Sequence, residues 1–296
     1  MSDLMVIGPT LLDGVPDAIY HGGRVRTPGP QTSQSMLKLL IPPSTPREFQ
    51  HSLIAPPQPR RAFDVGRAAH TLVLGVGDPF SCCPSDRLSI DGKMSTTRAK
   101  QWAADEREGG RTPLTPTDYD AVHRMAEAIL SHGRAAELVR DPDRRPEVSG
   151  FCEISDGLWF RCRFDLLGGD VCDFKTSADP HPDAFVRAAY RYGYHVQDVA
   201  YRRAVELITG LRMGPMTLIV VGKEAPHLVG IYTLDAEFER LGNQQLDASI
   251  ATYLEQLAKH GSPTAEGVRW DGLPEQAEPL SPPAWADIYD EEIEVI

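Results

Sequence analysis

Two short stretches decide the fold of this chain: residues 161–165 read Arg-Cys-Arg-Phe-Asp, and residues 173–176 read Asp-Phe-Lys-Thr. Side chains two positions apart on a β-strand point to the same face of a sheet. Asp173 and Lys175 therefore share one face, while Phe174 turns into the core. A carboxylate that can hold a divalent cation, beside an ammonium group that can contact water or phosphate, suits phosphodiester hydrolysis.

An Asp-x-Lys triplet alone carries little weight, because about one is expected by chance in a chain of 296 residues. The surrounding pattern predicts three consecutive strands, at 146–155, 158–167 and 170–177. The first carries Glu147, and the second carries Asp165 on the same face as Arg161 and Arg163. Carboxylates on neighbouring strands can share hard cations through their oxygens. Surface acids screened by arginines are the alternative interpretation.

The rest of the chain is mainly helical in pattern. Helices are predicted at 33–40, 63–74, 95–108 and 116–131. After the three strands, the pattern predicts one helix of about 25 residues from Pro182 through Leu207. Two further strands, near 216–221 and 228–234, precede a closing helix at 235–259. This order predicts a mixed α/β (α+β) fold, with a central mixed sheet flanked by helices and an N-terminal helical extension.

The expected organisation is one domain between two tails. Residues 1–30 are predicted as an extended arm, 31–260 as a single domain, and 261–296 as a tail rich in proline and acids. Within the domain, 31–145 forms the helical front part, and 146–260 forms the sheet core and its flanking helices.

The formal net charge of −12 argues against a surface that binds nucleic acid everywhere. An acidic chain can still focus positive potential at one cleft. The central segment carries the arginines for such a cleft: Arg161, Arg163, Arg187, Arg191, Arg202 and Arg203.

Five cysteines without a Cys-x-x-Cys pair predict reduced thiols and no disulfide framework. Cys152, Cys162 and Cys172 lie on the apolar side of the predicted strands, so we interpret them as buried thiols. No apolar run is long enough to cross a bilayer, and the first residues lack the parts of a secretion signal. A cytoplasmic location without a membrane partner is therefore expected.

Six motifs stand in order along the chain: Ser-Gln-Ser-Met-Leu at 33–37, Gly-x-x-x-His at 66–70, Glu-Val-Ser at 147–149, Arg-Cys-Arg-Phe-Asp at 161–165, Asp-Phe-Lys-Thr at 173–176 and Gln-x-x-x-Tyr at 197–201. Together they resemble the exodeoxyribonuclease VIII (RecE) group, in the RecB-like branch of the PD-(D/E)xK nucleases that are common in phages. The resemblance covers roughly residues 30–260 and implies a restriction-endonuclease-like core.

The resemblance implies a metal site formed by His70, Glu147, Asp165, Asp173 and the main-chain carbonyl of Phe174. Asp165 and Asp173 would be the principal ligands. His70 would bind through an unprotonated ring nitrogen. Glu147 matches the upstream family acid, and Glu153 is the alternative to it.

The resemblance also implies a catalytic set: Asp165, Asp173, Lys175, Gln197 and Tyr201. Lys175 would orient or activate the attacking water. Gln197 and Tyr201 are one helical turn apart and could reach the same phosphate or ion, although Tyr201 could instead serve to dock its helix on the sheet. Gln197 and Tyr201 would contact the substrate together with Arg161 and Arg163.

The implied cofactor is a pair of Mg²⁺ ions about 4 Å apart, for which Mn²⁺ could substitute. The nuclease branches with an iron–sulfur cluster carry a trio of cysteines after the Gln-x-x-x-Tyr helix. No cysteine follows Cys172 in this chain, so the resemblance implies no cluster here. The implied reaction is processive 5′→3′ digestion of one strand from a double-stranded DNA end during phage or prophage recombination. The implied partners are a second copy of the chain, in a homo-oligomeric ring, and a single-strand annealing protein. An endonuclease, a junction resolvase and a non-catalytic DNA-end-binding protein remain alternatives.

Overall fold

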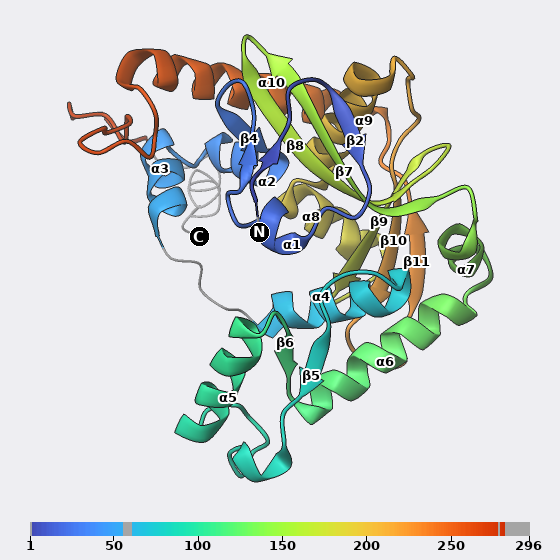
Figure 1. The fold of residues 1–296 in the computed structure, drawn as a ribbon. Helices are drawn as coiled ribbons and strands as arrows, with labels where there is room; N and C mark the ends of the chain where they lie inside the picture. Colours follow the sequence, from blue (N-terminus) through green and yellow to red (C-terminus); the bar gives the residue numbers. More distant parts are fainter. Residues whose placement is uncertain (1, 56–60, 278, 282–296) are drawn as a thin grey trace, which may run out of the picture.

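The computed structural model describes residues 2–55, 61–277 and 279–281. Its centre is a mixed sheet in the order β11-β10-β9-β8-β7-β2, and β4 also pairs with β8 (Figure 1). The strands of this sheet are β2 (Thr10–Leu12), β4 (Gln31–Ser33), β7 (Arg145–Ser155), β8 (Leu158–Leu167), β9 (Val171–Ser177), β10 (Thr217–Gly222) and β11 (Val229–Tyr232). Helices cover both faces, which confirms the predicted mixed α/β fold.

Strands β8 and β9 separate from one another at Asp165. β7 pairs with β8 in antiparallel register along most of its length. β9 pairs with β8 only through Leu166↔Cys172 and Leu167↔Val171, and it then continues in parallel beside β10. The place beside residues 159–161 of β8 is taken by β4. The sheet therefore contains a fork, and the fork begins at Asp165.

The first face of the sheet carries the larger core. It is covered by α2 (Gln34–Leu37), η1 (Lys38–Leu40), α3 (Pro46–Ile54), α8 (Pro182–Tyr192), α9 (Tyr194–Thr209) and α10 (Ala236–His260). Alternate residues of β8, such as Phe160 and Phe164, are fully buried here among apolar residues of α9 and α10. The period of two along β8 is what directs these side chains to one face.

The second face is covered by α4 (Arg61–Leu74), α6 (Pro116–Ser131) and α7 (Gly133–Arg140). Phe174 packs in this second core, as its position between Asp173 and Lys175 predicts. A small lobe formed by β5 (Phe80–Cys82), η2 (Ser85–Arg87), α5 (Thr97–Glu108) and β6 (Thr112–Leu114) projects beside α4 and α6 (Figure 1).

The predicted single helix after Pro182 is two helices, α8 and α9. Gly193 lies between them in the left-handed conformation, with φ of 70°. Its N–H donates to the carbonyls of Ala189 and Tyr190, which closes α8 with a glycine cap. The apolar spacing continues on both sides of Gly193, so periodicity alone could not reveal the break.

α10 packs so closely on α9 that one position requires glycine. A Cβ atom at Gly242 would lie 2.5 Å from the carbonyl oxygen of His195.

Within the described part of the chain, no helix is both long and apolar enough to cross a membrane.

Within the segment expected as an extended arm (1–30), residues 2–30 fold back onto the sheet instead. β1 (Leu4–Met5) pairs with β3 (Val25–Arg26), and β2 pairs with β7. The short helix α1 (Asp17–Tyr20) lies between β2 and β3 in the sequence. Tyr20 packs with Phe151 and Trp159 in a small separate core. These strands have two or three residues each, too few to show a period in the sequence.

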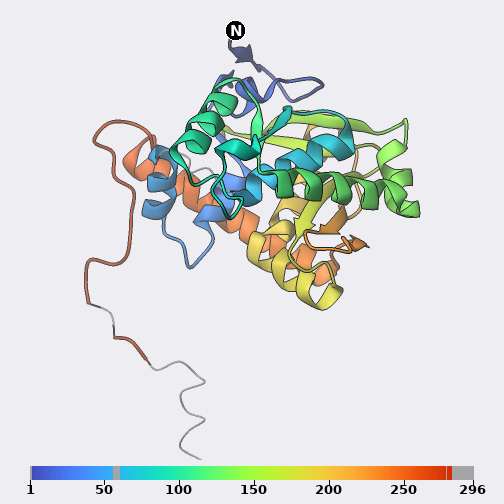
Figure 2. The ribbon, with the colours of Figure 1, turned by 90° about the horizontal axis from the view of Figure 1, so that it is seen from below.

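The domain also extends beyond the expected boundary at 260. Trp270 is buried, with its ring stacked on Phe49 and edge-on to Tyr253. The described residues that follow run away from the body, with Leu273 and Leu280 exposed (Figure 2). The cluster of acids at 287–294 lies outside the described residues.

The three regularly spaced cysteines are buried, as predicted. Cys152 and Cys162 belong to the first core, and Cys172 belongs to the second. Burial raises the pKa of Cys152 to about 12 and that of Cys172 to about 11. These thiols behave as small apolar residues.

Candidate active site

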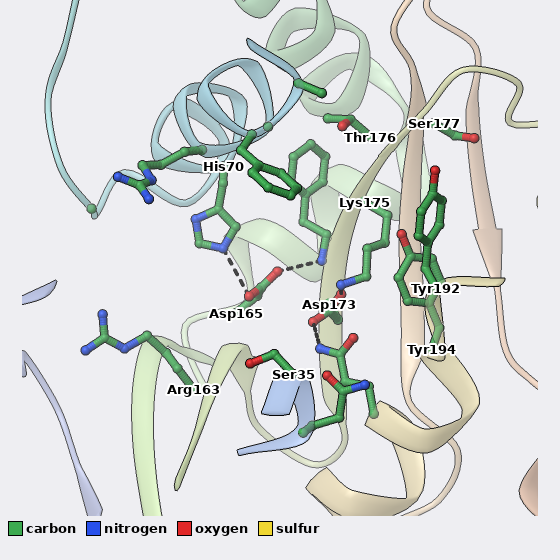
Figure 3. Close-up of a pocket in the computed structure, with 18 of the residues that line it drawn as sticks. Ser35, His70, Arg163, Asp165, Asp173, Lys175, Thr176, Ser177, Tyr192 and Tyr194 are labelled. Atoms are coloured by element: carbon green, nitrogen blue, oxygen red, sulfur yellow. Dashed lines mark hydrogen bonds and ion pairs between the residues drawn. The ribbon is translucent and has the colours of Figure 1, made fainter. Parts of the chain in front are cut away.

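A cavity of about 860 Å³ opens at the fork between β8 and β9 (Figure 3). This volume lies within the range of roughly 300–1,000 Å³ that is usual for ligand pockets. The predicted site residues that line it are His70, Glu147, Arg161, Arg163, Asp165, Asp173, Phe174, Lys175, Gln197 and Tyr201. Side chains from α4, three strands and α9 therefore converge on one space.

His70, Glu147 and Asp165 form a compact group contributed by α4, β7 and β8. Nε2 of His70 lies 3.2 Å from Oε1 of Glu147 and 3.1 Å from Oδ1 of Asp165. One possible ligand atom from each residue lies within 4.8 Å of the others. Two carboxylates and one imidazole suit a hard divalent cation. The donor set therefore fits a metal site of the kind that PD-(D/E)xK nucleases generally use.

The backbone of β7 is unusual at Glu147. This residue has a φ of 54° in the left-handed region, where a side chain other than glycine is uncommon. The β7–β8 pairing includes Val148↔Phe164 and Pro146↔Leu166 but omits the pair between them, Glu147 with Asp165. A strained backbone at this point is typical of residues that are placed for function.

The charges of this group are strongly coupled. Burial of the His70 ring opposes its protonation, but Asp165 and Glu147 outweigh that effect and raise the pKa of His70 to about 9. Burial raises the pKa of Glu147, helped by the nearby Asp165 carboxylate. Burial acts the same way on Asp165, but His70, Lys175 and the N–H of Phe174 lower its pKa overall. The N–H of Phe174 donates to Oδ2 of Asp165 at 2.7 Å.

Asp173 lies deeper than this group and has its own partners. It is 2% exposed, forms an ion pair with Lys175, and accepts a hydrogen bond of 2.6 Å from Nε2 of Gln197 (Figure 3). Burial and the nearby Asp165 raise the pKa of Asp173 to about 6, although Lys175 opposes the shift. The pKa of Lys175 is raised, because Asp173 and Asp165 outweigh the effect of its burial.

The two acids that the sequence leaves as alternatives lie in different places. Glu147 faces the cavity. Glu153 is exposed, and its Oε1 accepts a hydrogen bond of 2.8 Å from the N–H of Gly157 in the turn after β7. The ring of Tyr201 packs edge-on against Phe164, which is the docking role, and the residue also lines the cavity.

Arg161 and Arg163 line the cavity but are already bonded to α1 and its neighbours. Arg163 pairs with Asp17 and donates to the carbonyl of Val15 at 2.7 Å. Arg161 donates to the carbonyl of Tyr20. Both guanidinium groups therefore fix the N-terminal segment beside the site.

Several lining residues were not given a role from the sequence. Ser35 and Lys38 reach the cavity from the segment 33–38, and Tyr192 and Tyr194 reach it from either side of Gly193. Ser35 belongs to the Ser-Gln-Ser-Met-Leu motif and Lys38 directly follows it, but the motif indicated no task for either residue. The two tyrosines could not be recognised because the sequence pattern predicts one continuous helix through them.

A family model described as "PDDEXK-like domain of unknown function (DUF3799)" matches residues 33–268. The chain belongs to this PDDEXK-like family. No curated protein matches the chain. Among solved structures, it is similar to a crystal structure of a "putative exonuclease" from Eubacterium rectale, with 12% identity and a TM-score of 0.57 over 88% of this chain and 93% of the other. That likeness shows a shared fold, and the PDDEXK-like description of the family indicates a nuclease.

Proposed function

We propose that this protein is a Mg²⁺-dependent exodeoxyribonuclease that digests one strand of linear duplex DNA from its end. The observation that supports this proposal most is the convergence at the fork. There Asp165, Asp173 and Lys175 share one cavity with His70 and Glu147. Metal-ligand oxygens and an ammonium group are what phosphodiester hydrolysis requires.

The metal would be held by His70, Glu147 and Asp165, with Asp173 and the Phe174 carbonyl completing the set. When bound, divalent cations in such sites stabilise negative charge on phosphate oxygens and make a bound water more acidic. We propose two Mg²⁺ ions, with Mn²⁺ as a substitute. Two carboxylates beside one imidazole are consistent with these hard cations.

The side chains around the metal position the substrate and the water. Lys175 holds its ammonium against Asp173, where it can orient a water and offset phosphate charge. Gln197 donates to Asp173 at 2.6 Å and so fixes the orientation of that carboxylate. Tyr201 stands one helical turn further along α9, from where its hydroxyl can reach a phosphate oxygen. Arg161 and Arg163 supply positive charge at the wall formed by β8.

The finer features are also part of the proposal. They are 5′→3′ polarity, processive release of mononucleotides, a ring-shaped homo-oligomer around DNA, and a role beside a single-strand annealing protein in phage or prophage recombination. The support for them is the set of six motifs in the sequence.

The test is digestion of 5′-labelled linear duplex with Mg²⁺, scored for mononucleotides, beside the same sequence as a closed circle. The expected result is degradation of the linear form alone, because an exonuclease requires an end. Asp165→Ala should abolish it and Lys175→Ala should slow it by about 10²- to 10⁴-fold, while Glu153→Gln should leave it unchanged. Cutting of the circle would indicate an endonuclease instead. Full activity in Lys175→Ala would refute the proposed chemistry.

A further inference from the structure

The corner between α8 and α9 carries three tyrosines, at positions 190, 192 and 194. Tyr192 and Tyr194 line the cavity on either side of Gly193, and their ring centroids lie 5.9 Å apart. Tyr194 is occupied, because the ammonium of Lys175 lies 4.7 Å from the centre of its ring. Tyr192 is 52% exposed. It therefore offers an aromatic face at the cavity that the fold itself does not cover.

Lys38 lies beside this corner. A Cβ atom on Gly193 would be 3.9 Å from both Cβ and Cδ of Lys38, and Gln34 ties the two segments together by donating to the Gly193 carbonyl at 3.2 Å. Lys38 lines the cavity and is half-buried. Among the described residues, its ammonium has neither an ion-pair nor a hydrogen-bond partner. An ammonium group in that position favours an anionic ligand.

The electrostatics agree with this geometry. Burial lowers the pKa of Lys38, and the neighbouring Lys175 lowers it further. Both ammonium groups belong to residues that line the cavity, and their positive charges repel one another. A phosphate oxygen between or beside them would relieve that repulsion.

We propose that Tyr192 and Lys38 form a nucleotide subsite, in which an unpaired nucleobase stacks on Tyr192 while its phosphate pairs with Lys38. The subsite rests on the proposed function, because it names the form of DNA that the same cavity accepts. Aromatic faces bind bases of any identity, since every base has a π-face. The subsite is therefore expected to select unpaired structure and not sequence.

The subsite has a consequence for the substrate. A base inside a duplex is stacked on both faces, so its ring must leave the stack before it can lie on Tyr192. The strand held beside Lys175 is then single-stranded at that nucleotide. Ends that fray readily, or that carry a short single-stranded overhang, are the preferred substrates.

The test uses the full chain with a short single-stranded oligonucleotide, in EDTA so that the strand is not cut. One thymidine is replaced by 5-iododeoxyuridine for photocrosslinking, or one adenosine by 2-aminopurine, whose fluorescence is quenched by stacking. The expected crosslink is to Tyr192. Tyr192→Ala should weaken binding roughly 5- to 150-fold and relieve the quenching, whereas Tyr192→Phe should keep both. Lys38→Gln should weaken binding with a shallower salt dependence, whereas Lys38→Arg should not.

Tyr190→Ala is the matched control. Tyr190 is 57% exposed on the same helix, stacks on His195, and does not line the cavity. Equal losses for Tyr190→Ala and Tyr192→Ala, or unchanged binding and quenching in Tyr192→Ala, would overturn the subsite. If the protein cuts DNA and Tyr192→Ala leaves KM unchanged, the subsite fails and the nuclease stands. If no Mg²⁺-dependent cutting occurs but Tyr192→Ala still loses binding, the nuclease fails and the subsite stands.

Discussion

Replacing Glu147 by Gln should remove most of the thermal stabilisation that we expect from the proposed Mg²⁺ ions. The Glu147 carboxylate lies with His70 and Asp165 in a group whose ligand atoms are within 4.8 Å of one another. An amide keeps the shape of the side chain but loses its charge. We expect Mg²⁺ affinity to fall on the order of 100-fold, the upper end of the effect of altering a metal's surroundings.

The size of the effect follows from linkage. A ligand at 100 times its Kd stabilises the folded state by about 2.7 kcal/mol, and a ligand at its Kd by about 0.4 kcal/mol. For a domain of this size, 1 kcal/mol shifts Tm by roughly 2–4 °C. At a Mg²⁺ concentration about 100 times the wild-type Kd, the wild-type Tm should therefore rise by roughly 5–11 °C. The Tm of Glu147→Gln should rise by about 1 °C.

The assay is thermal melting with and without Mg²⁺, with Glu153→Gln as the matched control on the same strand. Glu153 is exposed near the end of β7 and accepts from the N–H of Gly157 in the following turn, so its variant should keep the full shift. Burial raises the pKa of Glu147, which means that its charged form opposes folding at neutral pH. Glu147→Gln without metal should therefore melt no lower than wild type. A full Mg²⁺ shift in Glu147→Gln, or equal loss in both variants, would refute the assignment of this acid.

Three further outcomes are expected. Lys175→Met should slow cleavage of labelled linear duplex by about 10²- to 10⁴-fold, the usual contribution of a proton-transfer group, while the Mg²⁺ shift in Tm remains. Gly242→Ala should lower the free energy of unfolding by about 1–3 kcal/mol through overpacking, because its Cβ atom would lie 2.5 Å from the His195 carbonyl oxygen. The measurement is the midpoint of unfolding in urea, which should fall. Gly214→Ala, with open space around it, should leave the midpoint unchanged. Cys82, the exposed thiol of the five, should react first with a disulfide reagent, and the other four should require unfolding.

Much of the site could be predicted because it depends on local spacing. The period of two along β9 placed Asp173 and Lys175 on the cavity side and Phe174 in the core, and the structure has them there. The same period directed Cys162 inward and Asp165 to the site. Such an inference needs only the position of a residue along its strand, because successive side chains of a strand point to opposite faces of the sheet.

What could not be predicted depends on contacts between distant segments. β2 and β4 have three residues each and join the sheet through β7 and β8, more than 100 positions away. The break at Gly193 is set by a left-handed backbone, whereas the side-chain pattern runs through it. As a result, the tyrosines on either side of this corner could not be recognised as lining residues. The pairing of Arg163 with Asp17 could not be predicted either, because the two residues are far apart in the sequence.

The pairing registers explain why the fork lies where it does. In the β8–β9 ladder Leu166 pairs with Cys172, so continuing that ladder by one position would set Asp165 directly opposite Asp173. In the β7–β8 ladder the pairs on either side of Glu147 set it opposite Asp165. The three acids thus form one row across three strands, and directly opposed like charges destabilise a sheet.

Both ladders are interrupted at that row. β9 turns away after Cys172, and β7 omits one pair and adopts a φ of 54° at Glu147. The N–H of Phe174, left without a strand partner on β8, donates to the Asp165 carboxylate at 2.7 Å. The cavity therefore opens at the row of acids, and the freed main chain helps to hold the Asp165 carboxylate in it. A bound cation would offset the negative charge of this row, so the place where the sheet is interrupted is also the place of the proposed metal site.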